Sequence, residues 1–376
     1  MSGAGSMDPS SNPDPESDSQ PLLEVDGLRV GFPTHAGLAR AVDGVSFSVS
    51  RGETLCVVGE SGCGKSVTAL SIMGLVARPP ARIEGEIRFE GRDLLTLDAR
   101  SLADLRGNRL AMIFQEPMTS LNPAFTVGAQ LSEVLVRHRG LNREAAREAV
   151  IQMLERVRIP APAQRFEEYP HRMSGGMRQR VMIAMSLLCE PALLIADEPT
   201  TALDVTIQAQ VLGLMRQLRS EFGTAIVLIT HDLGVVAEMA DRVVVMYAGQ
   251  VVEQAPVKAL FAMPQHPYTV GLMGAIPSLA GGDDRLSAID GLVPAATDMP
   301  SGCRFASRCP FAELRCRTSV PALQEVEPGH WSRCWRAPMQ ALAAQIDQAT
   351  GAQESLSTGK QTASVVTAPG ESVGVQ

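Results

Sequence analysis

The chain has 376 residues, enough for one large domain and a smaller one, and 45% of them are hydrophobic, so a sizeable core can form. Its formal net charge of -8 argues against nucleic acid as the main partner. The longest apolar stretch, residues 181–196, is interrupted by Glu190-Pro191 and is too short to span a bilayer. Residues 1–20 contain no Lys or Arg and no apolar core, which predicts no signal peptide. A role at a membrane would therefore depend on partners.

The first third of the chain predicts mostly β-structure around one helix. Residues 22–30 and 41–49 alternate apolar and polar side chains, as half-buried antiparallel strands do. Residues 54–58 form a short apolar run typical of a buried parallel strand, and helical spacing follows over residues 65–76. Two further strands are expected at residues 85–89 and 109–114.

The middle of the chain predicts a helical insertion into this α/β arrangement. Apolar side chains at three- and four-residue spacing predict helices at residues 128–139, 142–157 and 175–188. Buried strands are expected again at 192–196 and 225–230. A hairpin is expected over residues 242–253, with its turn at Ala248-Gly249. Strands that alternate with helices predict a mainly parallel sheet with helices on its faces.

These patterns divide the chain into four parts. Residues 1–20 are rich in Ser, Pro and Asp and are expected to be a disordered tail. Residues 21–270 form the α/β domain, with an α-helical subdomain at about 117–191. Residues 271–340 form a small Cys-rich C-terminal region that begins with a Pro/Gly-rich linker, and residues 341–376 are expected to be a second disordered tail.

A complete P-loop follows the strand at residues 54–58. It consists of Gly59, Glu60, Ser61, Gly62, Cys63, Gly64, Lys65 and Ser66. Glycine lets backbone N–H groups approach a phosphate, and the start of the next helix adds favourable partial charge. Lys65 is expected to reach the β- and γ-phosphates, and the Ser66 hydroxyl to bind Mg²⁺. The alternative is a chance match to a glycine-rich turn, which the flanking strand and helix disfavour.

Two acids and two further polar residues follow later strands. The run at 192–196 leads into Asp197 and Glu198, which predicts Asp197 as a Mg²⁺ ligand and Glu198 as the base that accepts a proton from the attacking water. Gln115 is suited to contact Mg²⁺ and that water, and His231 to hydrogen-bond the γ-phosphate. A lone Gln or His at a strand end is usually structural, so only the order of the motifs supports a functional role for Gln115 and His231. In the alternative interpretation, the two acids cap a turn.

A second anion-binding motif, Ser174-Gly175-Gly176, opens the helix predicted from residue 175. The serine can cap that helix, and the glycines leave its amides exposed. One chain binds one γ-phosphate but has two anion-binding sites, the P-loop and this motif. The simplest arrangement that uses both sites is a head-to-tail dimer. Each Ser-Gly-Gly motif would then face the ATP held by the P-loop of the other subunit. The alternative is a capped helix after a flexible turn.

In this order, the motifs resemble those of the ATP-binding subunits of ABC transporters over roughly residues 22–262. The resemblance implies a P-loop NTPase fold of the ABC ATPase type, with a mainly parallel core sheet, an antiparallel β subdomain and an inserted helical subdomain. It implies ATP and Mg²⁺ as cofactors and, with Glu198 and His231 present, ATP hydrolysis. Phe32 resembles the aromatic residue that stacks on adenine. Asp204 lies in a motif that resembles the loop touching the partner subunit.

A narrower resemblance covers more of the chain. Residues 115–123, 169–171 and 266–269 and the Cys-rich region are similar to the ATPase subunit of oligopeptide, dipeptide and nickel permeases. This similarity implies a peptide importer in which the chain works with a second, often non-identical ATPase, two membrane permeases and an external binding protein, at the cytoplasmic face of the cell membrane. Import of nickel or another small solute, or a soluble ABC ATPase outside transport, are the alternatives.

Four cysteines near the C-terminus form a candidate metal site: Cys303, Cys309, Cys316 and Cys334. Thiolates select zinc or iron–sulfur clusters, and these spacings are looser than those of most structural zinc sites. The resemblance to the permease ATPases points to a [4Fe–4S] cluster. Zinc, with His330 as a replacement ligand, and four unligated thiols stay open as alternatives. Five nearby arginines are expected to offset the thiolate charge: Arg304, Arg308, Arg315, Arg317 and Arg333.

Overall fold

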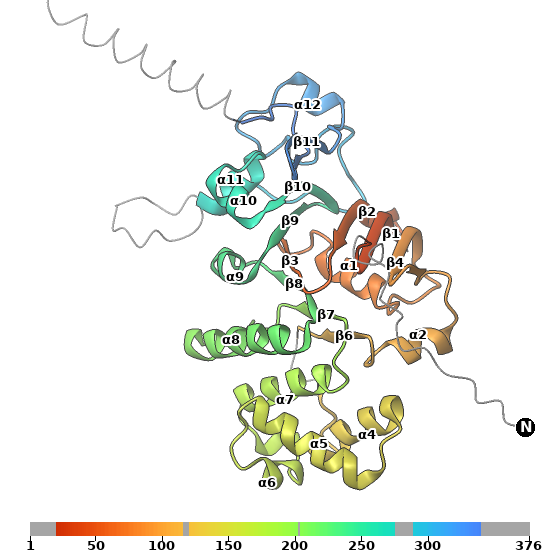
Figure 1. Ribbon diagram of the computed structural model, residues 1–376. Coiled ribbons are helices and arrows are strands. Elements are labelled where there is room, and N and C mark those ends of the chain that lie inside the picture. The colour runs from red at the N-terminus through yellow and green to blue at the C-terminus, as the bar shows by residue number, and fades with distance from the viewer. Residues whose placement is uncertain (1–19, 116–119, 202–203, 275–288, 340–376) are drawn as a thin grey trace, which may run out of the picture.

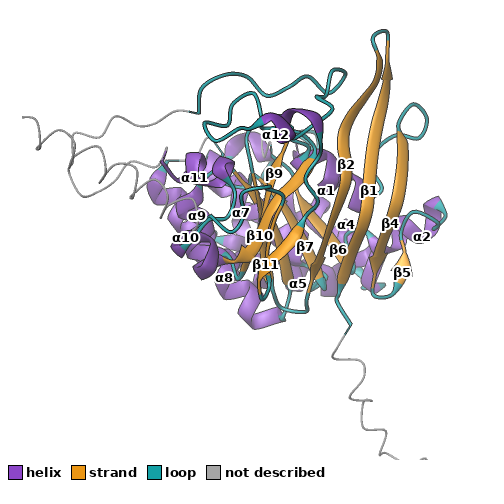
Figure 2. Ribbon diagram, turned by 90° about the horizontal axis from the view of Figure 1, so that it is seen from above, coloured by secondary structure: helices purple, strands orange, loops and turns teal. Residues whose placement is uncertain are grey.

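The computed structural model describes residues 20–115, 120–201, 204–274 and 289–339, and two sheets form its framework (Figure 1). The smaller sheet is antiparallel and has the strand order β2-β1-β4-β5. Its strands are β1 (Leu23–Thr34), β2 (Gly37–Val49), β4 (Arg82–Phe89) and β5 (Arg92–Asp93). The β1–β2 hairpin extends beyond the neighbouring strands (Figure 2). The strands predicted at 22–30 and 41–49 are therefore present and longer than predicted.

The larger sheet has eight strands in the order β11-β12-β10-β9-β3-β8-β7-β6. Its parallel strands are β3 (Thr54–Val58), β6 (Leu110–Ile113), β7 (Leu193–Asp197), β8 (Ala225–Thr230) and β9 (Arg242–Tyr247). Three strands continue it in antiparallel pairs: β10 (Gln250–Pro256), β12 (His330–Ser332) and β11 (Gln324–Glu327). The prediction of an α/β fold with a mainly parallel core sheet and an antiparallel β subdomain is confirmed.

The helix α1 (Lys65–Ile72) lies between the two sheets and contacts β1, β2 and β7. Alternate residues of β3 enter two different cores, as the two-residue period of a strand requires. Leu55 and Val57 pack on the side of α1 and the antiparallel sheet, whereas Cys56 and Val58 pack among the helices of the other face. The helix ends earlier than the predicted residue 76, because Gly74 has a left-handed backbone (φ 60°).

The inserted helices form a separate layer beyond β6 and β7 (Figure 1). They are α4 (Val127–Arg139), α5 (Arg143–Arg156), α6 (Pro162–Phe166) and α7 (Gly175–Leu187). The side chains of Thr126, Asn142 and Ser174 cap three of these helices by accepting hydrogen bonds from backbone N–H groups of the first turn. The helices expected at 128–139, 142–157 and 175–188 are present within one or two residues.

The remaining helices of the described ranges lie outside this inserted layer. They are α2 (Ala99–Leu105), α8 (Val205–Phe222), α9 (Leu233–Met239), α10 (Val257–Ala262), α11 (Pro267–Gly274) and α12 (Leu314–Thr318). Within the described ranges, no helix combines the length and the apolar character that a membrane span needs. The two predicted tails and motif residues 116–119 and 202–203 lie outside those ranges.

The Cys-rich C-terminal region is built into the core sheet. Its short hairpin β11–β12 pairs with β10, with Glu253 opposite Ser332. The fully buried Glu253 carboxylate lies 2.7 Å from Nε2 of His330 and also accepts a hydrogen bond from the backbone N–H of Gln265. The sequence did not predict this pairing, which holds the region against the core sheet.

Candidate functional site

The P-loop connects the buried strand β3 to α1, as predicted. Two of its glycines stand where no side chain fits. A Cβ atom on Gly59 would lie 2.2 Å from the backbone oxygen of Met246, and one on Gly64 would lie 2.4 Å from that of Ala41. Gly64 also has a φ of 99° and caps α1. The loop therefore needs glycine for both backbone conformation and close packing.

Lys65 is turned into the P-loop and is almost fully buried. Its Nζ donates hydrogen bonds to the backbone oxygens of Gly59 (2.8 Å) and Glu60 (3.1 Å). This ammonium group is thus held above the loop that surrounds a bound phosphate in P-loop proteins.

The structure brings three of the predicted catalytic side chains together at the ends of β6, β7 and β8. Glu198 lies 3.1 Å from Nε2 of Gln115 and 3.3 Å from Nδ1 of His231. Thr201 donates a third hydrogen bond to the same carboxylate, at 2.9 Å. Burial raises the pKa of Glu198, but the hydrogen bonds to Thr201 and His231 and the positive charge of His231 and Lys65 outweigh that effect, so the pKa lies below its ordinary value. The carboxylate is ionised at neutral pH, as a proton acceptor must be.

Asp197 is the adjacent acid and lies at the carboxyl end of β7. It is 5% exposed, and its Oδ1 atom has no hydrogen-bond partner among the described residues. Burial raises its pKa, while a hydrogen bond from Ser66 and the charge of Lys65 oppose that shift. A buried, unpartnered carboxylate oxygen beside a hydroxyl is a suitable donor set for Mg²⁺, which prefers oxygen ligands.

The Ser174-Gly175-Gly176 motif lies away from this cluster. Ser174 caps α7 by accepting a hydrogen bond from the backbone N–H of Met177 (3.3 Å). Ser174 and Gly175 are exposed, and Figure 1 shows α7 on the other side of β6 and β7 from α1. The P-loop and this motif of one chain thus do not face each other.

Two residues assigned from the resemblance occupy surface positions. Phe32 is half-buried on β1, near the end of the hairpin. Asp204 caps α8 by accepting a hydrogen bond from the backbone N–H of Ile207 (3.0 Å). The Ile207 side chain lies next to Gly176, so the start of α8 adjoins the Ser-Gly-Gly motif.

One buried residue of the site was missed by the sequence analysis. Gln179 on α7 is fully buried and donates a hydrogen bond to the backbone oxygen of Pro199, directly after Glu198. It thereby joins the helix of the Ser-Gly-Gly motif to the loop of the two acids. In the sequence Gln179 stands between Arg178 and Arg180, so no local signal marks it as buried.

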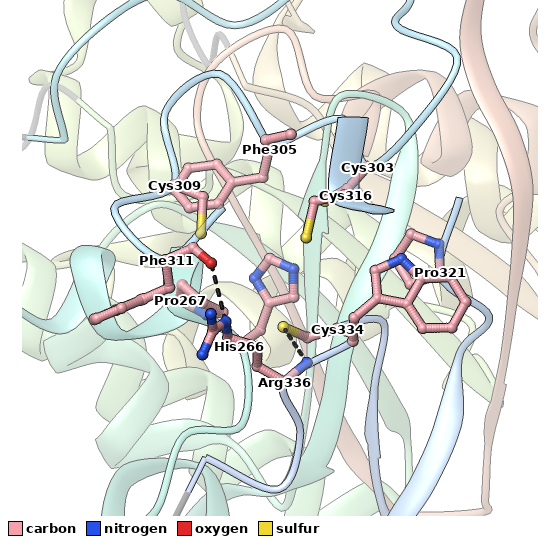
Figure 3. Close-up of a pocket in the computed structure, with 12 residues that line it drawn as sticks. His266, Pro267, Cys303, Phe305, Cys309, Phe311, Cys316, Pro321, Cys334 and Arg336 are labelled. Carbon is pink, nitrogen blue, oxygen red and sulfur yellow. Dashed lines mark hydrogen bonds between the residues drawn. The ribbon is translucent and has the colours of Figure 1, made fainter. Parts of the chain in front are cut away.

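The four C-terminal cysteines line one cavity together with Phe305, His266 and neighbouring residues (Figure 3). None of the four is in a disulfide. Burial raises the pKa of Cys303 and Cys334, and raises that of Cys309 to about 11. Among the described residues, no group of three or more His, Cys, Asp or Glu side chains is placed to hold a metal ion.

The side chains expected to support a metal have other partners. His330 is paired with Glu253 and does not line the cysteine cavity. Arg304 forms an ion pair with Asp43, and Arg315 forms one with Glu313. These two arginines therefore already have carboxylate partners, and the expectation that they offset thiolate charge stays a prediction. Arg308 also has a carboxylate partner, which lies in the P-loop.

The parallel strands are covered on both faces, and their carboxyl ends carry a P-loop, a buried lysine and an acid cluster. These features define the class of the protein as a P-loop ATPase. Residues 42–201 match the ABC transporter family, and residues 252–316 match the oligopeptide/dipeptide transporter C-terminal region.

Curated relatives agree with both matches. The probable peptide ABC transporter ATP-binding protein y4tR of Sinorhizobium fredii is 54% identical over 84% of this chain and 95% of its own. The oligopeptide transport ATP-binding protein AppD of Bacillus subtilis is also 54% identical, over 84% of this chain and 96% of its own. The chain belongs to the ATP-binding proteins of ABC transporters and is an ATPase that uses ATP and Mg²⁺.

A solved structure shows the same fold. The ATP-binding cassette MJ0796, in a dimeric post-hydrolysis state bound to ADP and Pi, has a TM-score of 0.56 and 26% sequence identity, and the match covers 63% of this chain and 99% of that one.

Proposed function

We propose that the chain is the ATP-hydrolysing subunit of an importer that takes up di- or oligopeptides. The cluster of Glu198, Gln115 and His231 supports hydrolysis, since it holds an ionised carboxylate among polar groups. The C-terminal match and the names of the relatives support peptides as the cargo.

Each residue has a distinct role in this proposal. The P-loop amides and Lys65 bind the phosphates, and Phe32 stacks on the adenine. Ser66, Gln115 and Asp197 would hold Mg²⁺, which would neutralise charge on the transferred phosphoryl group. Glu198 accepts the proton of the attacking water, and His231 hydrogen-bonds the γ-phosphate. The unpartnered Oδ1 atom of Asp197 supports the metal role.

Two chains complete each ATP site in this proposal, with Ser174, Gly175, Gly176 and Asp204 supplied in trans. The exposure of the α7 N-terminus supports it, because its free amides are open to a second subunit. Val205, at the start of α8 beside that motif, is 84% exposed, as an apolar contact residue of an interface would be in the isolated chain. The second subunit is a paralogue or an identical copy.

We expect Gly175→Asp to reduce ATP turnover about tenfold or more, because a like charge beside the γ-phosphate costs several kcal/mol and 1.4 kcal/mol is already tenfold. A side chain at Gly175 meets nothing within 4 Å in its own chain, so folding should survive. Gly213→Asp on α8 is the matched control, since that position is equally open. A Gly175→Asp dimer with normal turnover would contradict the shared site.

Two membrane permeases and an external binding protein complete the proposed transporter, which places the chain at the cytoplasmic face of the membrane. Reconstitution in vesicles with candidate permeases tests this function. A peptide-loaded binding protein should stimulate ATP turnover, and the empty binding protein should not. Stimulation by nickel alone would replace the peptide assignment with the nickel alternative, and no stimulation by any solute would favour a role outside transport.

The cysteine cavity is proposed to hold a [4Fe–4S] cluster. Four thiols without disulfides line it, and four thiolates are the usual ligand set of such a cluster. Burial raises the pKa of three of these thiols, so the metal itself would have to supply the charge that stabilises thiolates.

Anaerobically purified protein is expected to contain about four iron and four sulfide per chain, as the composition of a [4Fe–4S] cluster requires. Cys303→Ser should lose most of both, whereas Cys189→Ser, a buried cysteine in the ATPase core, should retain them. Zinc alone, or no metal, would contradict the cluster.

A further inference from the structure

Arg308, in the Cys-rich region, reaches the P-loop. It lies beside Cys309, and its guanidinium forms two hydrogen bonds to the carboxylate of Glu60, at 2.8 and 3.1 Å. The two residues are 248 positions apart in the chain. Paired hydrogen bonds of this kind are strong and fix orientation, because two parallel N–H groups meet two carboxylate oxygens.

All of the donor groups of Arg308 are used. Nε donates to the backbone oxygen of Asp290 (3.0 Å), and Nη2 donates also to that of Ile289 (2.9 Å). Nη1 donates also to the hydroxyl of Tyr247 (3.3 Å). An arginine has five N–H donors, and five hydrogen bonds hold this one, whose side chain is only 5% exposed. The guanidinium is therefore a rigid support for whatever it binds.

Glu60 is held at three points, which makes it a link between this region and the phosphate-binding lysine. Its carboxylate binds Arg308, and its backbone N–H donates to the hydroxyl of Tyr268 (2.8 Å). Its backbone oxygen accepts a hydrogen bond from Nζ of Lys65 (3.1 Å). Tyr268 is fully buried and packs against Phe305, which follows Cys303 in the same segment. The Cys-rich region thus fixes the side chain of Glu60 directly, and its Phe305 packs against the tyrosine that holds the backbone of Glu60.

The charge of Glu60 explains why such a partner is needed. A P-loop binds a highly negative triphosphate, and an unpaired carboxylate inside that loop would repel it. Arg308 neutralises this charge through an ion pair in which the arginine side chain is 5% exposed and the glutamate side chain 27% exposed, so water screens it less than a fully exposed pair.

We propose that Arg308 is a positioning residue of the ATP site, which holds and neutralises Glu60 so that the P-loop can bind the triphosphate. The role depends on ATP binding alone and requires neither a peptide cargo nor a metal in the cysteine cavity. It gives the C-terminal region a direct part in nucleotide affinity.

Binding of MgATP to the full-length chain tests the proposal. Arg308→Ala is expected to raise the Kd for MgATP about tenfold, the change that 1.4 kcal/mol produces. It should leave kcat at saturating ATP nearly unchanged, because the Glu198 cluster is untouched. Glu60→Gln in the Arg308→Ala background should restore most of the lost affinity, since it removes the unpaired charge.

Two controls separate positioning from a general loss of structure. Arg336→Ala removes another arginine of the same region, one that lines the cysteine cavity. The Arg336 side chain donates a hydrogen bond to the backbone oxygen of Phe311, inside the region. The Kd of this variant for MgATP should match that of the wild type. Arg308→Lys keeps the charge but not the paired geometry, so its affinity should lie between those of the wild type and the alanine variant.

Wild-type ATP affinity in a folded Arg308→Ala variant would overturn the proposal, as would failure of Glu60→Gln to restore it. If Arg308→Ala does not fold, wild-type affinity in Arg308→Lys would overturn it instead. Failure of peptide-stimulated turnover in vesicles would leave these results unchanged, so the two proposals fail separately.

Discussion

Glu198→Gln is expected to bind ATP with near-normal affinity but to hydrolyse it about 10²–10⁴-fold more slowly, the range that loss of a general base produces. The substitution keeps the size of the side chain and an oxygen for the hydrogen bond from Thr201. It removes the carboxylate that is ionised at neutral pH and can accept a proton, since the pKa of Glu198 lies below its ordinary value.

Single-turnover hydrolysis and equilibrium ATP binding, measured on the same preparation, check this result. Glu190→Gln provides the matched control, because Glu190 is an exposed carboxylate just before the other end of β7. Its turnover should equal that of the wild type. Near-normal hydrolysis by Glu198→Gln would remove Glu198 from the role of base and leave the cluster as a phosphate-binding or structural element.

Lys65→Ala has the second largest expected effect, on ATP binding itself. Hydrogen bonds to charged groups contribute about 1.5–3 kcal/mol each, so the loss of one such contact to the phosphates should weaken affinity between about tenfold and about 150-fold. Turnover should fall with it. The same change also removes the hydrogen bonds that hold Gly59 and Glu60, which should add to the loss.

Isothermal titration with MgATP measures this effect directly. Lys258→Ala is a suitable control because Lys258 is an exposed lysine of α10. Thermal unfolding of Lys65→Ala should show a folded protein, since β3 and α1 are held by apolar packing on both faces of the strand. Wild-type affinity in the folded Lys65→Ala variant would contradict the assignment of the phosphate site.

Much of the core fold could be predicted because its signals are local. The strands β3 and β8 are short buried apolar runs, and the helices α4, α5 and α7 show apolar spacing after capping residues. The P-loop and the Asp197-Glu198 pair are short sequence motifs whose chemistry is known. Gln115 and His231 carried no such local signal, and only the order of the motifs predicted that they belong with Glu198.

The rest depended on contacts between distant segments. The strands β11 and β12 have four and three residues, too few to show a period, and their pairing with β10 is a tertiary effect. The helix α8 was not among the predicted elements, although its buried side chains have helical spacing. No local pattern connects Arg308 to Glu60 or Gln179 to Pro199, because each pair forms only after the chain has folded.

The measurement that tests the central claim most directly is the specific ATPase activity as a function of protein concentration, with the mass of the active species determined in the same samples. A site shared between two chains predicts that activity rises with concentration, or with addition of the second ATPase, as a 40.1 kDa chain forms dimers in the presence of ATP. Full activity, independent of concentration, in a species with the mass of one chain would contradict it.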